Sequence, residues 1–172
     1  MRFNEFLRMN EIFNSQLLPT EVDFQKRKDT DVEKRYSFVF ERKNPLRYLV
    51  IFERYQQMAI VGWAVKFRID HPTSDFVTMV NDLSAKEVKD LFSQIYYIVI
   101  NVMREHNFKT LFFVGSTDKR VKFYQKILGK IIAKQLNWRM IVRSGKIMIT
   151  FDDRIFETEE FRFFEMLDFV CD

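Results

Sequence analysis

The chain has 172 residues, of which 47% are hydrophobic and 30% are charged, and its formal net charge is +4. This length and composition are typical of a single globular domain whose apolar core needs no metal ion or disulfide. The single cysteine, Cys171, excludes an internal disulfide, and no apolar run reaches the length of about 18 residues that a membrane span requires.

Charge is distributed unevenly along the chain. Residues 1–151 carry 26 Lys and Arg against 16 Asp and Glu, a net charge of +10, whereas residues 152–172 carry 2 against 8, a net charge of −6. The basic part can attract phosphate, nucleic acid or an acidic protein. Alternatively, the acidic segment, which contains "RIFETEEFRFFEMLDF", docks on the basic part or in the groove of a partner.

The N-terminal half of the sequence predicts one helix followed by strands. Residues 4–18 place apolar side chains at helical spacing, and Pro19 ends this helix. The stretch "RYSFVFER" has the period of two that a strand requires, and "LRYLVIFERY" and "MAIVGWAVKFRI" follow the same pattern. With "DFVTMVND" as a fourth strand, these segments predict an antiparallel meander.

A long helix is predicted to begin at Ser84. In "SAKE" the Ser84 hydroxyl can accept a hydrogen bond from the backbone N–H of Glu87, while the Glu87 carboxylate accepts one from that of Ser84. Apolar residues then recur at steps of three and four to about residue 107. Because "KTLFFVG" predicts a further strand, the strand, helix and strand imply a right-handed crossover and a locally parallel pair.

The C-terminal part predicts a second helix and a hairpin. The segment "DKRVKFYQKIL" carries an apolar stripe that includes Tyr124, and "WRMIVRSGKIMITF" turns at Ser144-Gly145. The predicted fold is therefore α+β, with a mixed, mostly antiparallel sheet flanked by helices. Its expected parts are a helix or leader at 1–19, the sheet domain at 20–151 and the acidic aromatic segment at 152–172.

The element order and two motifs resemble the GNAT acyltransferase fold over roughly residues 36–151. In that family a meander leads through a pyrophosphate-binding loop into a long helix, another strand and a helix similar to N-x-x-A-x-x-x-Y-x-K-x-G-F. Here "DKRVKFYQKILGK" is similar, with Tyr124 where the family often has its general acid, and "IVGWAVKF" looks like the family's third strand. The resemblance implies that an active member would transfer an acetyl group from acetyl-CoA to an amine.

That resemblance also implies which residues would act. Tyr124 would protonate the leaving thiolate. The candidate cofactor-binding residues are Ser84, Ala85, Lys119 and Arg120.

The segment "NDLSAK" departs from the family pattern, because members that bind acetyl-CoA carry Q/R-x-x-G-x-G/A at this place. Glycines let backbone N–H groups approach the pyrophosphate at a helix N-terminus, and this segment has none. Asp82 adds a carboxylate, and two unit charges about 4 Å apart repel by roughly 4 kcal/mol at an effective dielectric constant of about 20. We therefore expect that no cofactor binds and that Tyr124 is a core residue with a hydrogen-bonded hydroxyl.

Other candidate sites depend on His71, His106 and a row of lysines. Two histidines are too few for a metal cluster, so no metal site is predicted. If the second helix continues, a lysine recurs at every fourth residue from Lys122 to Lys134. This row is interpreted as a solvated face, with a phosphate-binding stripe and hence a nucleic-acid partner as the weaker alternative.

The N-terminal stretch "MRFNEFLRMNEIF" resembles the capsid-targeting leaders of internal proteins in T-even-type tailed phages. Arg2, Glu5 and Phe6 match the leader, and "MNE" is a loose version of the Leu/Ile-x-Glu site that a prohead protease cuts. The resemblance implies a GNAT-like phage accessory or virion-associated protein, in the host cytoplasm or the virion, that binds a capsid or host protein. An ordinary amphipathic helix packed on the sheet is the other interpretation of this stretch, and an active N-acetyltransferase is the alternative function.

Overall fold

The computed structural model describes most of the chain between Leu18 and Thr150. The described residues are 18–57, 60–71, 83–114, 122, 125–126, 132–133, 138–143 and 146–150. Nearly all of the predicted helix at 4–18, the predicted strand "DFVTMVND" and the acidic segment at 152–172 lie outside these ranges. Most of the predicted helix around Tyr124 lies outside them too.

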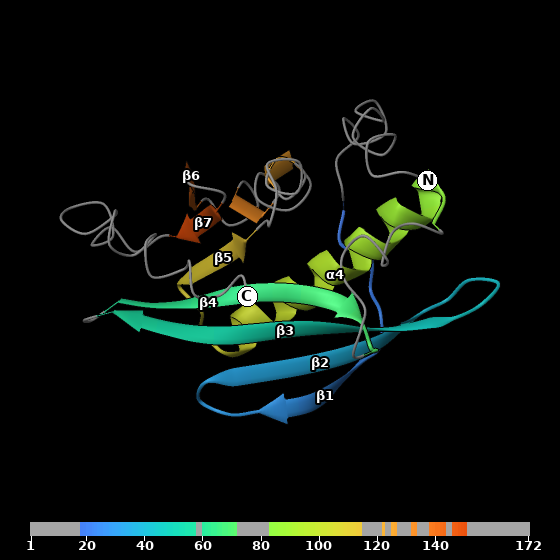
Figure 1. Ribbon diagram of the computed structural model, residues 1–172, viewed down its shortest axis with the longest axis horizontal. Helices are drawn as coiled ribbons and strands as arrows, with labels where there is room; N and C mark the ends of the chain where they lie inside the picture. The colour runs from blue at the N-terminus through green and yellow to red at the C-terminus, as the bar shows by residue number, and fades with distance from the viewer. Residues whose placement is uncertain are drawn as a thin grey trace. The chain divides into compact units, whose positions relative to one another are not determined.

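Among the described residues, seven strands form one mixed sheet. The strands are β1 (Phe24–Asp29), β2 (Glu33–Phe40), β3 (Leu46–Gln57), β4 (Ile60–Ile69), β5 (Thr110–Val114), β6 (Arg139–Arg143) and β7 (Lys146–Thr150), and the helix α4 spans Ala85–Glu105. The strand order is β1-β2-β3-β4-β5-β7-β6 (Figure 1). The pairs β1/β2, β5/β7 and β6/β7 are antiparallel, and β4 and β5 are parallel. The prediction of an α+β fold with a mostly antiparallel sheet is confirmed.

Two features refine the predicted topology. The parallel pair is present, and its first strand is β4, with Trp63 opposite Leu111. The sequence pattern does not predict β1, because every residue of this strand after Phe24 is polar and exposed. This strand forms one edge of the described sheet.

The chain divides into two compact units. The first unit is Met1–Ile51 with Lys66–Val102, and the second is Phe52–Val65 with Met103–Asp172. The first unit holds β1, β2 and most of α4, and the second holds β5, β6 and β7.

In the first unit, α4 packs against one face of the meander (Figure 1). The ring of Phe24 meets that of Tyr97 edge-on with centroids 6.4 Å apart, and Phe67 meets Phe92 in the same way at 5.5 Å. Such pairs add about 0.5–1.5 kcal/mol each to the stabilisation from burial. Tyr48 is fully buried in this core, and burial raises its pKa to about 12.

The end of α4 turns the chain toward β5. Asn107 adopts a left-handed conformation with φ of 54°, and its N–H donates to the Arg104 carbonyl. The N–H of Phe108 donates to the Met103 carbonyl over 3.0 Å, which completes a Schellman motif. In the second unit the Phe108 ring stacks on Trp63 with centroids 4.3 Å apart. Among the described residues, no helix is both long and apolar enough to cross a membrane.

Candidate functional site

The first turn of α4 carries the capping box that the sequence predicts. The backbone N–H of Ser84 donates to the Glu87 carboxylate over 2.7 Å, and the backbone N–H of Glu87 donates to the Ser84 hydroxyl over 3.2 Å. The first N–H groups of a helix are the ones that bind an anion such as pyrophosphate. Here two backbone N–H groups at this terminus are already bonded within the chain.

The Glu87 carboxylate also sets the charge at this helix end. Hydrogen bonds from the Ser84 backbone and side chain lower the pKa of Glu87 below its usual value of 4.5, so the group is ionised at neutral pH. Arg42 lies beside it, with its Nε 3.7 Å from a Glu87 oxygen. This arrangement stabilises the carboxylate through the positive end of the helix, and the same carboxylate repels a phosphate group.

The structure describes two of the five residues that the resemblance implies for an acetyltransferase site. Ser84 immediately precedes α4 and Ala85 begins it. Tyr124, Lys119 and Arg120 lie outside the described residues. The described site residues therefore form a helix N-terminus that is capped by the chain itself.

The two histidines lie in different surroundings. His71 is exposed, and the ring of His106 stacks on Phe108 with centroids 5.6 Å apart. The Nε2 atom of His106 is 3.9 Å from a Glu105 carboxylate oxygen. Within the described ranges, no group of three or more His, Cys, Asp and Glu residues could hold a metal ion.

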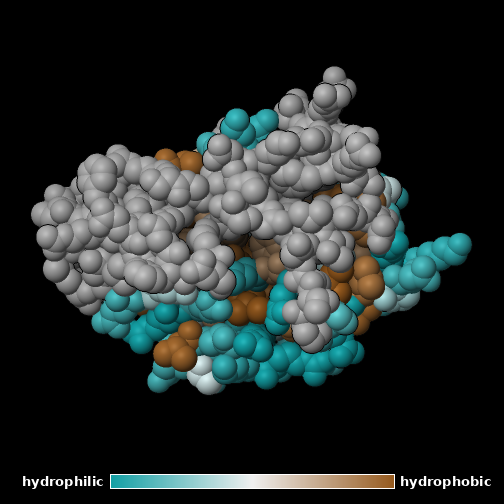
Figure 2. Space-filling model, in the orientation of Figure 1, coloured by the Kyte–Doolittle hydropathy of each residue, from teal (hydrophilic) through white to brown (hydrophobic). Residues whose placement is uncertain are grey.

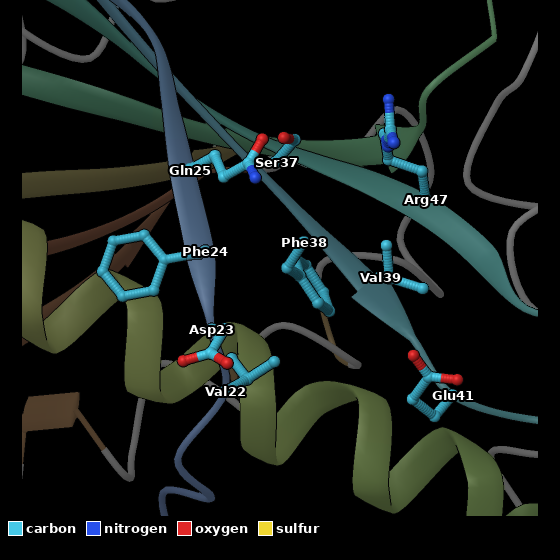
Figure 3. A pocket seen from close by; sticks show the side chains of 9 residues that line it. All are labelled: Val22, Asp23, Phe24, Gln25, Ser37, Phe38, Val39, Glu41 and Arg47. Atoms are coloured by element: carbon cyan, nitrogen blue, oxygen red, sulfur yellow. The ribbon is translucent and has the colours of Figure 1, made fainter.

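A pocket of about 320 Å³ opens in the first unit at the β1 edge of the sheet (Figure 3). Its lining residues come from the segment entering β1 and from β1, β2, the turn after β2, and β3: Val22, Asp23, Phe24, Gln25, Ser37, Phe38, Val39, Glu41 and Arg47. The β1/β2 register runs from Phe24 opposite Phe38 to Asp29 opposite Lys34. The pocket therefore lies where β2 continues past the beginning of β1.

A contact with α4 explains why the strands separate here. The backbone N–H of Thr20 donates to the Ser93 carbonyl of α4 over 3.1 Å. Because Thr20 is bonded to the helix and Phe24 is paired with β2, the intervening residues leave the sheet. Val22 and Asp23 consequently line the pocket and do not extend β1.

The pocket combines apolar walls with polar groups. The Phe24 and Phe38 rings lie on the side of the strands that faces α4, whereas Gln25 and Ser37 lie on the other side (Figure 3). Asp23 and Glu41 are exposed and make no hydrogen bond or ion pair with any residue that the structure describes. No sequence motif indicates this pocket, since the break in strand pairing that forms it depends on tertiary structure.

No protein-family model and no curated protein matches this sequence. Among solved structures, the chain is similar to one described as "The crystal structure of KacTA-DNA complex", with 14% sequence identity and a TM-score of 0.37. The similarity covers 74% of this chain and 75% of that chain. At this identity and TM-score the similarity assigns neither a family nor a function.

Proposed function

We propose that this chain is a non-catalytic binding protein on a GNAT-like fold whose acyl-CoA site is degenerate. The observation that carries the proposal is the capping box of α4. Ser84 and Glu87 bond each other's backbone N–H groups at the helix end where the family holds pyrophosphate, and Glu87 adds a negative charge there. A chain that cannot hold the acyl donor has no acetyl group to transfer.

The order of the described elements supports the GNAT-like part of the proposal. The strands β1 to β4 precede the long helix α4, and β5 then lies parallel to β4. A hairpin of β6 and β7 follows, with β7 beside β5. The succession of strands, long helix and further strand agrees with the order that the resemblance implies, although fold alone does not fix function.

Binding of acetyl-CoA tests the proposal directly. A ligand present at 100 times its dissociation constant stabilises a protein by about 2.7 kcal/mol, which a thermal melt detects. We expect no change in melting temperature with acetyl-CoA at about 1 mM, which is on the order of a hundred times a dissociation constant of about 10 µM, and no heat of binding by calorimetry. Micromolar binding, together with an amine acetylation that Tyr124→Phe abolishes without changing stability, would establish the alternative N-acetyltransferase.

The sequence of residues 1–13 supports a second part of the proposal, that the protein is a phage accessory or virion-associated protein. These residues lie outside the described ranges. A fusion of residues 1–19 to a fluorescent protein, made during infection by a T-even-type phage, is expected to enter the capsid. The same fusion carrying Glu5→Lys and Phe6→Ser should stay out, and equal packaging of the two fusions would contradict the leader hypothesis.

A further inference from the structure

We infer that the pocket at the β1 edge binds an extended peptide segment of a partner protein, which adds as a short strand beside β2 and places a basic side chain against Asp23 and Glu41. This inference rests on the proposal that the protein acts by binding. It names the surface and the chemistry of the partner segment.

The backbone of β2 is available for such pairing. β2 extends to Phe40, two residues beyond the last pair with β1, which is Phe24 with Phe38. In an antiparallel ladder, alternate residues direct their N–H and C=O groups to each side, so Val39 or Phe40 directs its groups toward this edge. No backbone hydrogen bond joins Val22 or Asp23 to β2 among the described residues. An added strand would satisfy these groups.

The rest of the edge does not offer the same opportunity. Beyond Gln25, the exposed residues of β1 are Lys26, Arg27, Lys28 and Asp29. Charged side chains on an edge strand, lysines above all, oppose further strand pairing. The surface in the view of Figure 2 shows hydrophilic residues gathered over this part of the molecule, with isolated hydrophobic patches. Strand addition is therefore confined to the pocket.

The walls of the pocket suit one side chain of an extended peptide. Val39 is 38% exposed and Val22 is half-buried, so these two side chains offer apolar surface that can cover an aliphatic stem. Ser37 is only 3% exposed, and its hydroxyl accepts a hydrogen bond from the Arg27 Nε over 2.8 Å. Ser37 is paired with Gln25 of β1, so this bond fixes the last fully paired part of the two strands next to the place where a peptide would be added.

Charge selects a basic side chain. The Asp23 and Glu41 carboxylates carry no ion pair within the described part of the chain. Arg47 also lines the pocket, but its guanidinium points away from the Glu41 carboxylate (Figure 3). Lysine and arginine each combine an aliphatic stem, which suits the apolar walls, with a positive charge, which suits the two carboxylates. The phosphates of a nucleic acid would instead be repelled by these carboxylates.

A peptide titration followed by amide NMR tests the inference. The probes are three acetylated and amidated heptapeptides of alternating Thr and Val with a central Lys, Glu or Ala, added to the full-length protein. We expect chemical-shift changes centred on Val22–Gln25 and Ser37–Glu41. The Lys peptide should bind about two- to five-fold more tightly than the Glu peptide, as expected for a partly exposed ion pair. Replacing its alternate backbone amides by N-methyl amides should abolish binding.

Matched charge reversals separate the pocket from general electrostatics. Glu41→Lys should abolish the preference for the Lys peptide over the Glu peptide, because its charge offsets that of Asp23. Asp31→Lys makes the same charge change at an exposed position outside the pocket and should leave the preference intact. If Glu41→Lys fails to fold, Glu41→Gln should reduce the preference, because only the Asp23 carboxylate then remains in the pocket.

Several outcomes would overturn the inference. These are no shift with any peptide at millimolar concentration, shifts centred on other strands, equal affinity for the Lys and Glu peptides, and an equal effect of both charge reversals. Failure of the proposed function would be seen separately, as binding of acetyl-CoA with the pocket amides unmoved.

Discussion

The Ser84 backbone N–H donates to the Glu87 carboxylate over 2.7 Å, and this bond closes the N-terminus of α4. The reciprocal bond from the Glu87 N–H to the Ser84 hydroxyl makes the two residues a capping box. The capping box thereby stabilises the helix, and the backbone N–H groups of Ser84 and Glu87 that it uses are not available to an anionic ligand.

Removing the cap should destabilise the protein measurably. Ser84→Ala leaves the Glu87 N–H without its side-chain acceptor, and the free energy of unfolding should fall by about 1 kcal/mol. Glu87→Gln keeps an amide oxygen as acceptor but loses the charge near the helix end, so its effect should be smaller. Lys86→Ala, an exposed position in the same turn, is the control and should change stability by less than about 0.5 kcal/mol. Urea unfolding measures all three, and equal losses for Ser84→Ala and Lys86→Ala would show that the cap contributes nothing.

Asp29 should make stability depend on pH in the acid range. The hydrogen bond from Lys34, with a second from Lys26, lowers the pKa of Asp29 from 3.8 to about 2. Because the folded-state pKa is depressed, the stabilisation is present above the unfolded-state pKa and is lost as pH falls from about 4 to about 2. The melting temperature of the Asp29→Asn variant should therefore fall less steeply than that of the wild type over that pH interval.

The control for this pH profile is Asp31→Asn, at an exposed position in the same turn without an ion pair to the described residues. Its melting temperature should follow the wild-type curve. Parallel curves for wild type and Asp29→Asn would show that the bonds to Lys34 and Lys26 do not persist in solution.

The outcome at α4 and at β1 shows what the sequence can predict. The capping box is confirmed because its bonds join residues three positions apart, so the local sequence contains everything that forms them. β1 is not predicted, because its alternation is absent and its place in the sheet comes from pairing with β2. Local patterns therefore identify elements that their own residues stabilise.

For a related reason, the sequence does not predict the candidate pocket. It exists because Thr20 bonds to Ser93, 73 positions further along the chain, and so draws the entering segment away from β2. Neither residue belongs to a motif that indicates this contact. The interpretation of Tyr124 as a core residue stays a prediction, because that residue lies outside the described ranges.

Gly62 should not tolerate a side chain. A Cβ atom added at this position would overlap the ring of Phe112, which is fully buried on β5. Gly62→Ala should lower the free energy of unfolding by about 1–3 kcal/mol through overpacking. In a double-mutant cycle, Phe112→Leu should make the alanine substitution less costly, because the smaller side chain leaves space for the methyl group. Strictly additive losses of stability would show that the Phe112 ring is not the reason why position 62 excludes a side chain.

Thr110 and Thr150 lie opposite each other on β5 and β7, and their buried hydroxyl oxygens are 2.7 Å apart. The Thr150 hydroxyl donates to the Lys109 carbonyl over 3.2 Å, so the Thr110 hydroxyl is the donor between the two threonines. Thr150→Val would leave the Thr110 donor without this acceptor, at a cost of about 1–3 kcal/mol, whereas Thr110→Val leaves the Thr150 donor satisfied and should cost less. Because replacing both hydroxyls removes the unsatisfied donor, the double variant should be more stable than Thr150→Val alone. Urea unfolding of the three variants measures this order, and a double variant that loses the sum of the two single effects would contradict the assigned direction of the hydrogen bond.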